Sequence, residues 1–191
     1  MINKKYFKQL QDQFVSLDEK KRKLQKLSSD ALHASKRAIF SFHRDDWKTG
    51  EDLLDGALKN LKEIEKKYLS ERLDGEGSFK AAQEEYVEAE IYRQFLYKED
   101  IGPIKNWQAD SDIYLGGLTD AVGEMVRYAV RKATSRDFHE VKRAQEAIEA
   151  IAAVLIELNL TGYLRTKFDQ AKQARHKMEQ VMYEVSLRAR K

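Results

Sequence analysis

The amino-acid sequence predicts an all-α protein whose 191 residues form a single domain of long helices. Charged residues make up 35% of the chain and only one proline and nine glycines interrupt it, which is the composition of long helices. Apolar residues recur with helical spacing, and no run alternates between apolar and polar residues as a strand does. We therefore expect one α-helical bundle covering residues 1–191.

The composition also limits the classes of function. The chain has no cysteine, which excludes disulfides and thiolate metal sites and fits a reducing, cytoplasmic compartment. No window of about 18 residues is continuously apolar, so no membrane-spanning segment is predicted. The net charge is only +3, but basic residues gather toward the N-terminal part, as expected of a protein that handles a polyanion.

The first helix is predicted from near residue 3 to about residue 42. Its apolar residues recur every seven positions, and two phenylalanines each follow a member of the repeat by four positions. A repeat sustained over five heptads predicts a long seam against partner helices. Its members are Leu10, Leu17, Leu24, Ala31 and Ala38, together with Phe14 and Phe42.

Five further helices follow from their apolar faces and from the residues that break or cap them. Gly102-Pro103 is the strongest breaker and marks the one long loop, and Asp110, Ser111 or Asp112 can cap the helix that follows it. The predicted helices run up to about 72, from 78 to about 98, from about 112 to 134, from 135 or 137 to 161, and from about 163 to 188.

Two of these helices each place a pair of carboxylates one turn apart. Glu85 falls within a stripe of small and apolar residues and Glu88 lies at its edge, and neither has a lysine or arginine three or four residues away. Asp120 and Glu124 repeat the arrangement on the next helix. Four inward-facing acids without neighbours of opposite charge predict a cation site, whereas the alternative interpretation is a pair of solvated helix faces.

Three glycines share a helix face with Asp120 and Glu124. A glycine inside a helix costs roughly 1 kcal/mol relative to alanine, so it needs a packing reason. We therefore expect another backbone to pack closely against the face that carries Gly116, Gly117 and Gly123.

Basic residues of the first helix form a candidate nucleic-acid-binding surface. Phosphate contacts need positive charges spaced along a groove, although a solvated outer face is the simpler interpretation of any single lysine. Arg127, one turn after Glu124, is either a phosphate contact or the partner of Glu124 in an ordinary helix pair. The other candidates are Lys20, Lys21, Arg22, Lys23, Lys36, Arg37 and Arg44.

Other side chains give weaker signals. The chain lacks the Glu-x-x-His pattern of a di-iron site, and most of its scattered histidines are expected on the surface. Tyr92 or Tyr128 could stack on a base beside the acids, but packing is the default for both. The four histidines are His33, His43, His139 and His176.

Four segments resemble the translin/trax family and span nearly the whole chain in order. The segment from Lys26 to Arg44 is similar to the first trax helix, and residues 83–89 (Gln-Glu-Glu-Tyr-Val-Glu-Ala) resemble the trax segment QEYVEA. Residues 114–127 resemble the next family block, and residues 181–188 are similar to the ending that translin and trax share. The chain lacks the long insertion of eukaryotic trax, so it resembles a compact prokaryotic, archaeal member.

The resemblance implies a fold, an assembly and an activity. The fold would have six or seven helices and would assemble into a hollow octamer, either with itself or with a translin-like partner subunit. The activity would be metal-dependent cleavage of single-stranded RNA or small duplex RNA, housed in the trax-type subunit. The acids that carry this activity in trax fall on Glu85, Glu88, Asp120 and Glu124, a full set that translin lacks.

The chemistry of the four acids agrees with this implication. Mg²⁺, or Mn²⁺ in its place, prefers carboxylate oxygens and would lower the pKa of a water that attacks phosphorus. We assign Glu88, Asp120 and Glu124 as the direct ligands, and Glu85 either completes the set or orients the water. Two alternatives remain, namely an oligomer that binds RNA or single-stranded DNA without cutting it, and a purely structural helical oligomer.

Overall fold

Six long helices are the only regular elements in residues 1–68 and 77–188, which this computed structural model describes. This result confirms the all-α prediction. None of the described helices combines the length and the apolar character needed to cross a bilayer. The helices are α1 (Lys4–His43), α2 (Trp47–Tyr68), α3 (Gly77–Leu96), α4 (Ser111–Thr134), α5 (Phe138–Glu157) and α6 (Gly162–Arg188).

The helix ends follow local capping chemistry. The side chain of Asn3 accepts a hydrogen bond from the Tyr6 amide at the start of α1, and Asp137 accepts one from the Glu140 amide at the start of α5. The prediction that α5 continues to residue 161 is wrong, because the backbone at Leu158 is already extended. The predicted end of the second helix near residue 72 lies outside the described residues.

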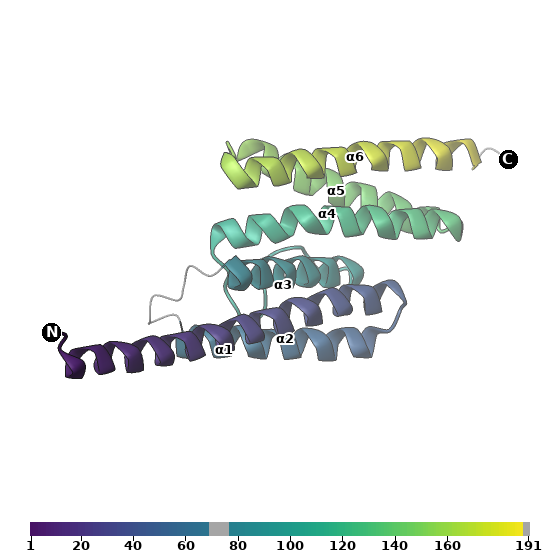
Figure 1. Cartoon of the computed structure of the whole chain (residues 1–191). Coiled ribbons are helices and arrows are strands. Elements are labelled where there is room, and N and C mark those ends of the chain that lie inside the picture. Colours follow the sequence, from purple (N-terminus) through teal and green to yellow (C-terminus); the bar gives the residue numbers. More distant parts are fainter. Residues whose placement is uncertain (69–76, 189–191) are drawn as a thin grey trace.

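The helices lie in layers with α3 and α4 in the middle (Figure 1). Helix α1 packs on α2 and α3 on one side of the molecule, and α4 packs on α5 and α6 on the other. The contact between α3 and α4 joins the two sides. Any side chain that points into this contact is therefore close to the centre of the molecule.

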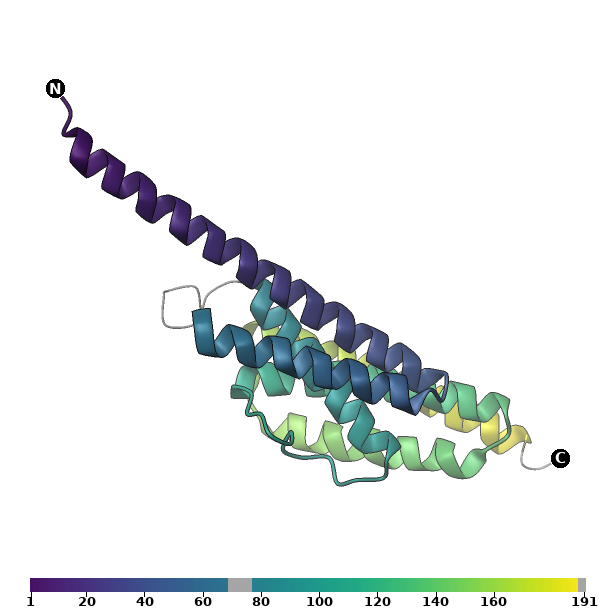
Figure 2. The same ribbon diagram turned by 90° about the horizontal axis from the view of Figure 1, so that it is seen from below.

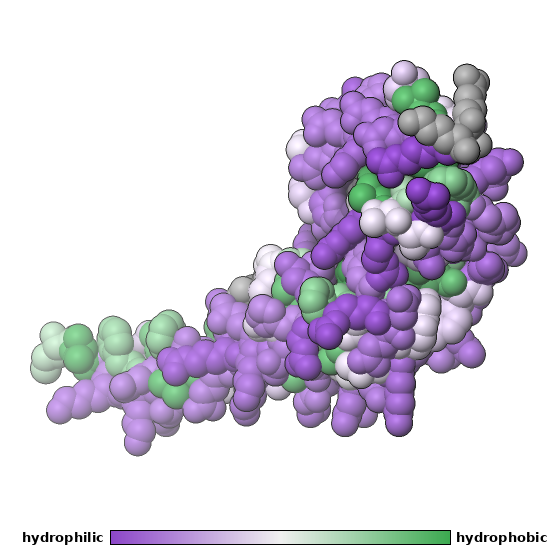
Figure 3. All heavy atoms as spheres, turned by 90° about the vertical axis from the view of Figure 1, so that its right-hand side faces the viewer, coloured by the Kyte–Doolittle hydropathy of each residue, from purple (hydrophilic) through white to green (hydrophobic). Residues whose placement is uncertain are grey.

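The first half of α1 projects beyond the other helices (Figure 2). The second half of the predicted seam is buried, since Leu24, Ala31, Ala38 and Phe42 are fully inaccessible to solvent. No residue of the projecting half of α1 (residues 4–23) is buried, and Phe14 remains 71% exposed. Hydrophobic side chains accordingly mark this arm in Figure 3. Within residues 1–68 and 77–188 of a single chain, no other helix covers Leu10, Phe14 and Leu17, so the seam is formed only from Leu24 onward and its first half stays a prediction.

Glycine allows α3 and α4 to approach each other closely. A Cβ atom at Gly117 would lie 2.6 Å from both the Glu84 carbonyl oxygen and the Val87 Cβ atom, and one at Gly116 would lie 2.9 Å from the Glu84 Cδ atom. These two positions confirm the expected close packing. The expectation is wrong for Gly123, which is exposed and would meet no atom within 4 Å.

The two glycine environments give a matched test of this contact. Gly117→Ala should destabilise the protein by about 1–3 kcal/mol, because the added methyl group overlaps backbone and side-chain atoms of α3. Gly123→Ala in the same helix should stabilise it by up to about 1 kcal/mol, because its methyl group enters open space and alanine favours the helix. Urea unfolding at one fixed protein concentration measures both changes. A Gly117→Ala variant at least as stable as the wild type would show that α3 and α4 do not need this close approach.

Candidate active site

The four acids predicted from the sequence meet between α3 and α4. Their side chains are partly buried, with exposed fractions of 17% for Glu85, 31% for Asp120 and 21% for Glu124. Burial, which is the largest cause, and the negative charges of Glu85, Asp120 and Glu124 together raise the pKa of Glu88 to about 9. All three acids therefore act on the Glu88 carboxyl, and the four side chains are called the acid cluster below.

Cations from other helices approach two members of the acid cluster. The Lys36 Nζ atom of α1 lies 3.6 Å from a Glu85 oxygen, and Lys167 of α6 forms an ion pair with Asp120. Burial raises the pKa of Glu85 and of Asp120, although Lys36 and Lys167 oppose the increase at Glu85 and Lys167 opposes it at Asp120. The expectation that the acids lack neighbours of opposite charge is thus wrong beyond their own helices.

A buried histidine holds the third acid. The Nε2 atom of His43 contacts a Glu124 carboxylate oxygen, and its Nδ1 atom lies 3.1 Å from the Tyr92 hydroxyl. Because a carboxylate only accepts hydrogen bonds, the Nε2 atom donates its hydrogen to Glu124. His43 is buried, whereas His33, His139 and His176 are exposed, as expected of most histidines. Tyr92 and Tyr128 are buried as well, which excludes the idea that either one stacks on a base.

Arg127 pairs with Glu124 of the same helix, which is one of the two roles expected for it from the sequence. Its guanidinium lies 3.6 Å from the Glu124 carboxylate, and 59% of its side chain is exposed. Lys36 is similarly exposed, at 57%. Each of these two cations therefore has one contact inside the acid cluster and most of its surface in solvent.

The remaining basic candidates lie elsewhere on α1 or directly after it. Lys21, Arg22 and Lys23 are exposed on the projecting half of α1, where Arg22 pairs with Asp18 at 2.5 Å. Lys20 on the same stretch is half-buried. The candidates nearer the end of α1 are Arg37, which is exposed, and Arg44, whose guanidinium lies 5.6 Å from the centre of the Phe40 ring.

Glu84 is a part of the site that sequence reasoning missed. Its Oε2 atom lies 3.0 Å from the Lys167 Nζ atom and accepts a hydrogen bond of 2.7 Å from the Tyr163 hydroxyl. Gly116 leaves room for this carboxylate beside α4. The stripe of small and apolar residues on α3 gave no hint of Glu84, because its partners come from α6, about eighty residues later in the chain.

The donors of the acid cluster fit a divalent cation in chemical type, although in this conformation protein cations hold three of them. Carboxylate oxygens are the preferred ligands of Mg²⁺ and Mn²⁺. Burial raises the pKa of Glu88, and the negative charges of Glu85, Asp120 and Glu124 add to that increase, so a cation beside Glu88 would be favourable. Within the described ranges, 1–68 and 77–188, no three histidine or acidic side chains already stand in a metal-holding arrangement.

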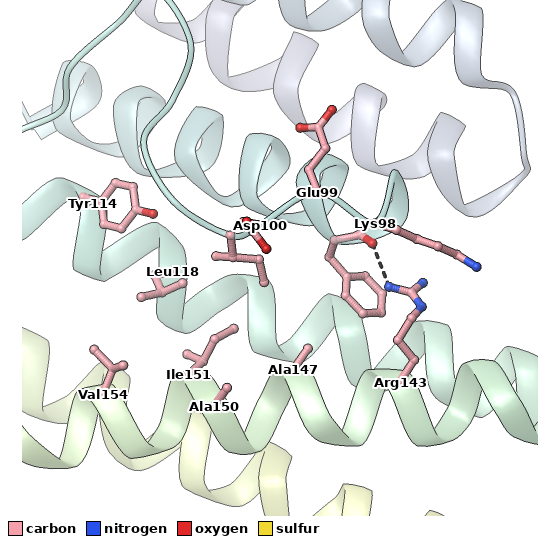
Figure 4. Close-up of a pocket in the computed structure, with 12 residues that line it drawn as sticks. Lys98, Glu99, Asp100, Tyr114, Leu118, Arg143, Ala147, Ala150, Ile151 and Val154 are labelled. Atoms are coloured by element: carbon pink, nitrogen blue, oxygen red, sulfur yellow. Dashed lines mark hydrogen bonds between the residues drawn. The ribbon is translucent and has the colours of Figure 1, made fainter.

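A separate cavity of about 570 Å³ lies between α5 and the segment that joins α3 to α4. Its wall is mainly apolar, and Leu118, Ile151 and Val154 point into it in Figure 4. The Arg143 side chain at one end donates a hydrogen bond of 2.8 Å to the Phe95 carbonyl oxygen. No member of the acid cluster lines this cavity.

Comparison with known proteins gives one family and one fold. The profile of the Translin family matches residues 18–189. No curated protein matches the sequence. The crystal structure of apo-NeC3PO aligns over 97% of this chain and 98% of its own, with a TM-score of 0.86 and 22% identity. The crystal structure of AfC3PO gives a TM-score of 0.86 at 22% identity, and the complex of AfC3PO with duplex RNA gives 0.85 at 21%, each over 95% of this chain and 97% of the other.

The raised pKa of Glu88 predicts a pH-dependent stability. An unfolded glutamate titrates near 4.5, whereas folded Glu88 titrates near 9, so between these values the folded state holds a proton that the unfolded state has released. Stability of the metal-free protein must then fall as the pH rises through this window. Glu88→Gln has no carboxyl group to titrate and so lacks this loss of stability. The free energy of unfolding of the variant should therefore exceed that of the wild type by an amount that grows from about pH 5 to about pH 9.

Urea unfolding in the presence of EDTA measures this advantage. Glu146→Gln, which changes an exposed glutamate of α5, serves as the control and should follow the wild type across the pH range. A difference in the free energy of unfolding between Glu88→Gln and the wild type that stays constant at all pH values would contradict the raised pKa of Glu88.

Proposed function

Since the chain belongs to the translin family, we propose that it is a trax-type, metal-dependent endoribonuclease that hydrolyses single-stranded RNA or small duplex RNA. One observation carries this proposal: four carboxylates from α3 and α4 share a partly buried site, where burial and the charges of the other three raise the pKa of Glu88 to about 9. Four acids brought together in a partly buried site destabilise the folded state, and such groupings are typical of functional sites. The fold likeness to AfC3PO in its complex with duplex RNA agrees with an RNA substrate.

The proposed chemistry assigns a role to each group. Glu88, Asp120 and Glu124 would hold Mg²⁺ or Mn²⁺, which supplies positive charge against the phosphate and makes water more acidic. Glu85 completes the ligand set or orients the attacking water. His43 fixes the Glu124 carboxylate through its Nε2 proton.

Substrate binding falls to the exposed cations beside the acid cluster. Lys36 and Arg127 each keep more than half of their side chain in solvent while contacting an acid, so they can reach phosphates that flank the reacting one. In-line attack of water on phosphorus breaks the bond to the 3′ oxygen and leaves a 3′-hydroxyl and a 5′-phosphate. The ribose 2′-hydroxyl takes no part in this route.

We further propose that the chain works as a homo-oligomer, an octamer by family resemblance, with a translin-like subunit as an alternative partner. The projecting half of α1 exposes large apolar side chains that include Phe7 at 52% and Phe14 at 71%. Exposed apolar surface of this kind marks an interaction site.

A second candidate function is an oligomer that binds RNA or single-stranded DNA without cutting it. The observation that favours it is the set of protein cations on Glu85, Asp120 and Glu124, namely Lys36, Lys167 and Arg127. In this alternative these ion pairs are permanent, and the acid cluster never takes up a metal ion. The two functions differ in one measurable respect: only the enzyme cuts bound RNA, and a chelator should stop that cleavage.

Cleavage of a labelled single-stranded RNA tests the enzyme proposal. The purified protein should cut the RNA with Mg²⁺ or Mn²⁺ and stop with EDTA, and the products should carry 3′-hydroxyl ends. Glu88→Gln should reduce the rate by ~100-fold or more while binding RNA as before, because it removes a ligand charge without changing side-chain shape. RNA that is bound but never cut would support the binding oligomer, and cyclic phosphate ends would exclude attack by water.

RNA affinity tests the two exposed cations. The double variant Lys36→Ala/Arg127→Ala should weaken binding of single-stranded RNA and flatten the slope of log affinity against log salt by about 1.4, since each lost phosphate contact contributes about 0.7. Lys67→Ala/Lys142→Ala is the matched control, because both of these lysines are exposed and pair with a glutamate of their own helix. Equal salt slopes for the two double variants would remove Lys36 and Arg127 from the RNA surface.

A further inference from the structure

Lys167 is the buried cation of the acid cluster. It reaches the cluster from α6, and only 12% of its side chain is exposed, against 57% for Lys36 and 59% for Arg127. Its Nζ atom contacts Asp120 directly and lies 3.0 Å from a Glu84 oxygen. Burial disfavours the charge of Lys167, but hydrogen bonds with Asp120, Tyr163 and Glu84 outweigh burial and raise its pKa above the ordinary value.

The surroundings of Lys167 form a built site for an ammonium group. Tyr163, one helical turn earlier, donates a hydrogen bond to Glu84, and its ring centre lies 5.2 Å from the Lys167 Nζ atom. Gly116 of α4 provides the space that the Glu84 carboxylate occupies. Residues of α3, α4 and α6 thus hold one ammonium group between two carboxylates and an aromatic face.

The charge of Lys167 acts on more than its two direct partners. It lowers the pKa of Glu85 and of Glu88, neither of which it is paired with. One ammonium group therefore offsets part of the repulsion throughout the acid cluster. A divalent ion in the same cluster would do the same, and the two cations would repel each other at close range.

Lys167 and a divalent metal ion would both bind the carboxylate of Asp120. A carboxylate oxygen that is engaged with an ammonium group is not free to ligate a metal ion in the same position, and Asp120 is a ligand in the proposed function. Glu84 offers Lys167 a second acceptor, so Lys167 can leave Asp120 without losing every carboxylate contact.

We infer that Lys167 is the internal counter-ion of the metal-free acid cluster and that it competes with the divalent cation for Asp120, thereby setting the metal affinity of the site. This inference rests on the proposed function, because that proposal makes Asp120 a ligand. Lys167 is a positioning residue here, since it acts through Asp120.

Binding of Mn²⁺ to the full chain, followed through the electron paramagnetic resonance signal of free Mn²⁺ in the absence of RNA, tests the inference. Lys167→Met keeps the unbranched stem but removes the charge, so it should bind Mn²⁺ more tightly, on the order of tenfold or more. Lys167→Arg keeps the charge and should bind like the wild type. An affinity of Lys167→Met equal to or weaker than that of the wild type overturns the inference.

Two further variants make the result specific. Lys132→Met removes a different charge from the site's own helix α4, where Lys132 pairs with Asp137, and should leave Mn²⁺ affinity unchanged. In an Asp120→Asn background, Lys167→Met should no longer give a gain, because the contested ligand is gone. A gain that persists in that background shows that the two cations do not compete for Asp120. Lys167→Gln, whose amide can still donate to Asp120 and Glu84, replaces Lys167→Met if circular dichroism shows that the methionine variant is unfolded.

The outcome also separates this inference from the proposed function. If the wild type binds Mn²⁺ and cuts RNA while Lys167→Met binds Mn²⁺ no better, the inference fails and the enzyme proposal stands. If neither protein binds Mn²⁺, both fail together.

Discussion

The close approach of α3 to α4 at Gly116 and Gly117 is the constraint on which the candidate site depends. A larger residue at Gly117 would collide with the backbone of α3, so the short distance between the two helices depends on this glycine. That distance brings two carboxylates of each helix into one small volume, where burial and, after it, their mutual repulsion raise the pKa of Glu88. Packing thus imposes an electrostatic cost that the rest of the molecule offsets.

The compensation comes from helices on both sides of the α3–α4 contact. Helix α1 supplies Lys36 and His43, and α6 supplies Lys167. The acid cluster therefore joins α1 and α6 to the two central helices, and breaking one of these pairs would leave a partly buried charge without a partner. The candidate site and the arrangement of the helices in the bundle stabilise each other for this reason.

The features that could be predicted from the sequence are those that depend on residues within about one helical turn of each other. The α4 start near Asp110, the paired acids on α3 and α4 and the close packing at Gly117 all follow from local spacing. The sequence could not predict the partners of the acids, because His43 and Glu124 are 81 positions apart and Lys167 and Asp120 are 47 apart. The heptad repeat likewise indicates a seam along all of α1 but cannot tell whether another helix of the same chain covers it.

The projecting half of α1 has a consequence for how the backbone of this chain is protected from exchange with solvent. Its amide hydrogens are held by hydrogen bonds of one isolated helix, since no side chain of residues 4–23 is buried. Opening there needs only a local helix–coil transition, whereas opening after Leu24 also exposes core side chains. In a single chain, deuterium uptake along this one continuous helix would therefore change from fast to slow near Leu24, without any break in its geometry.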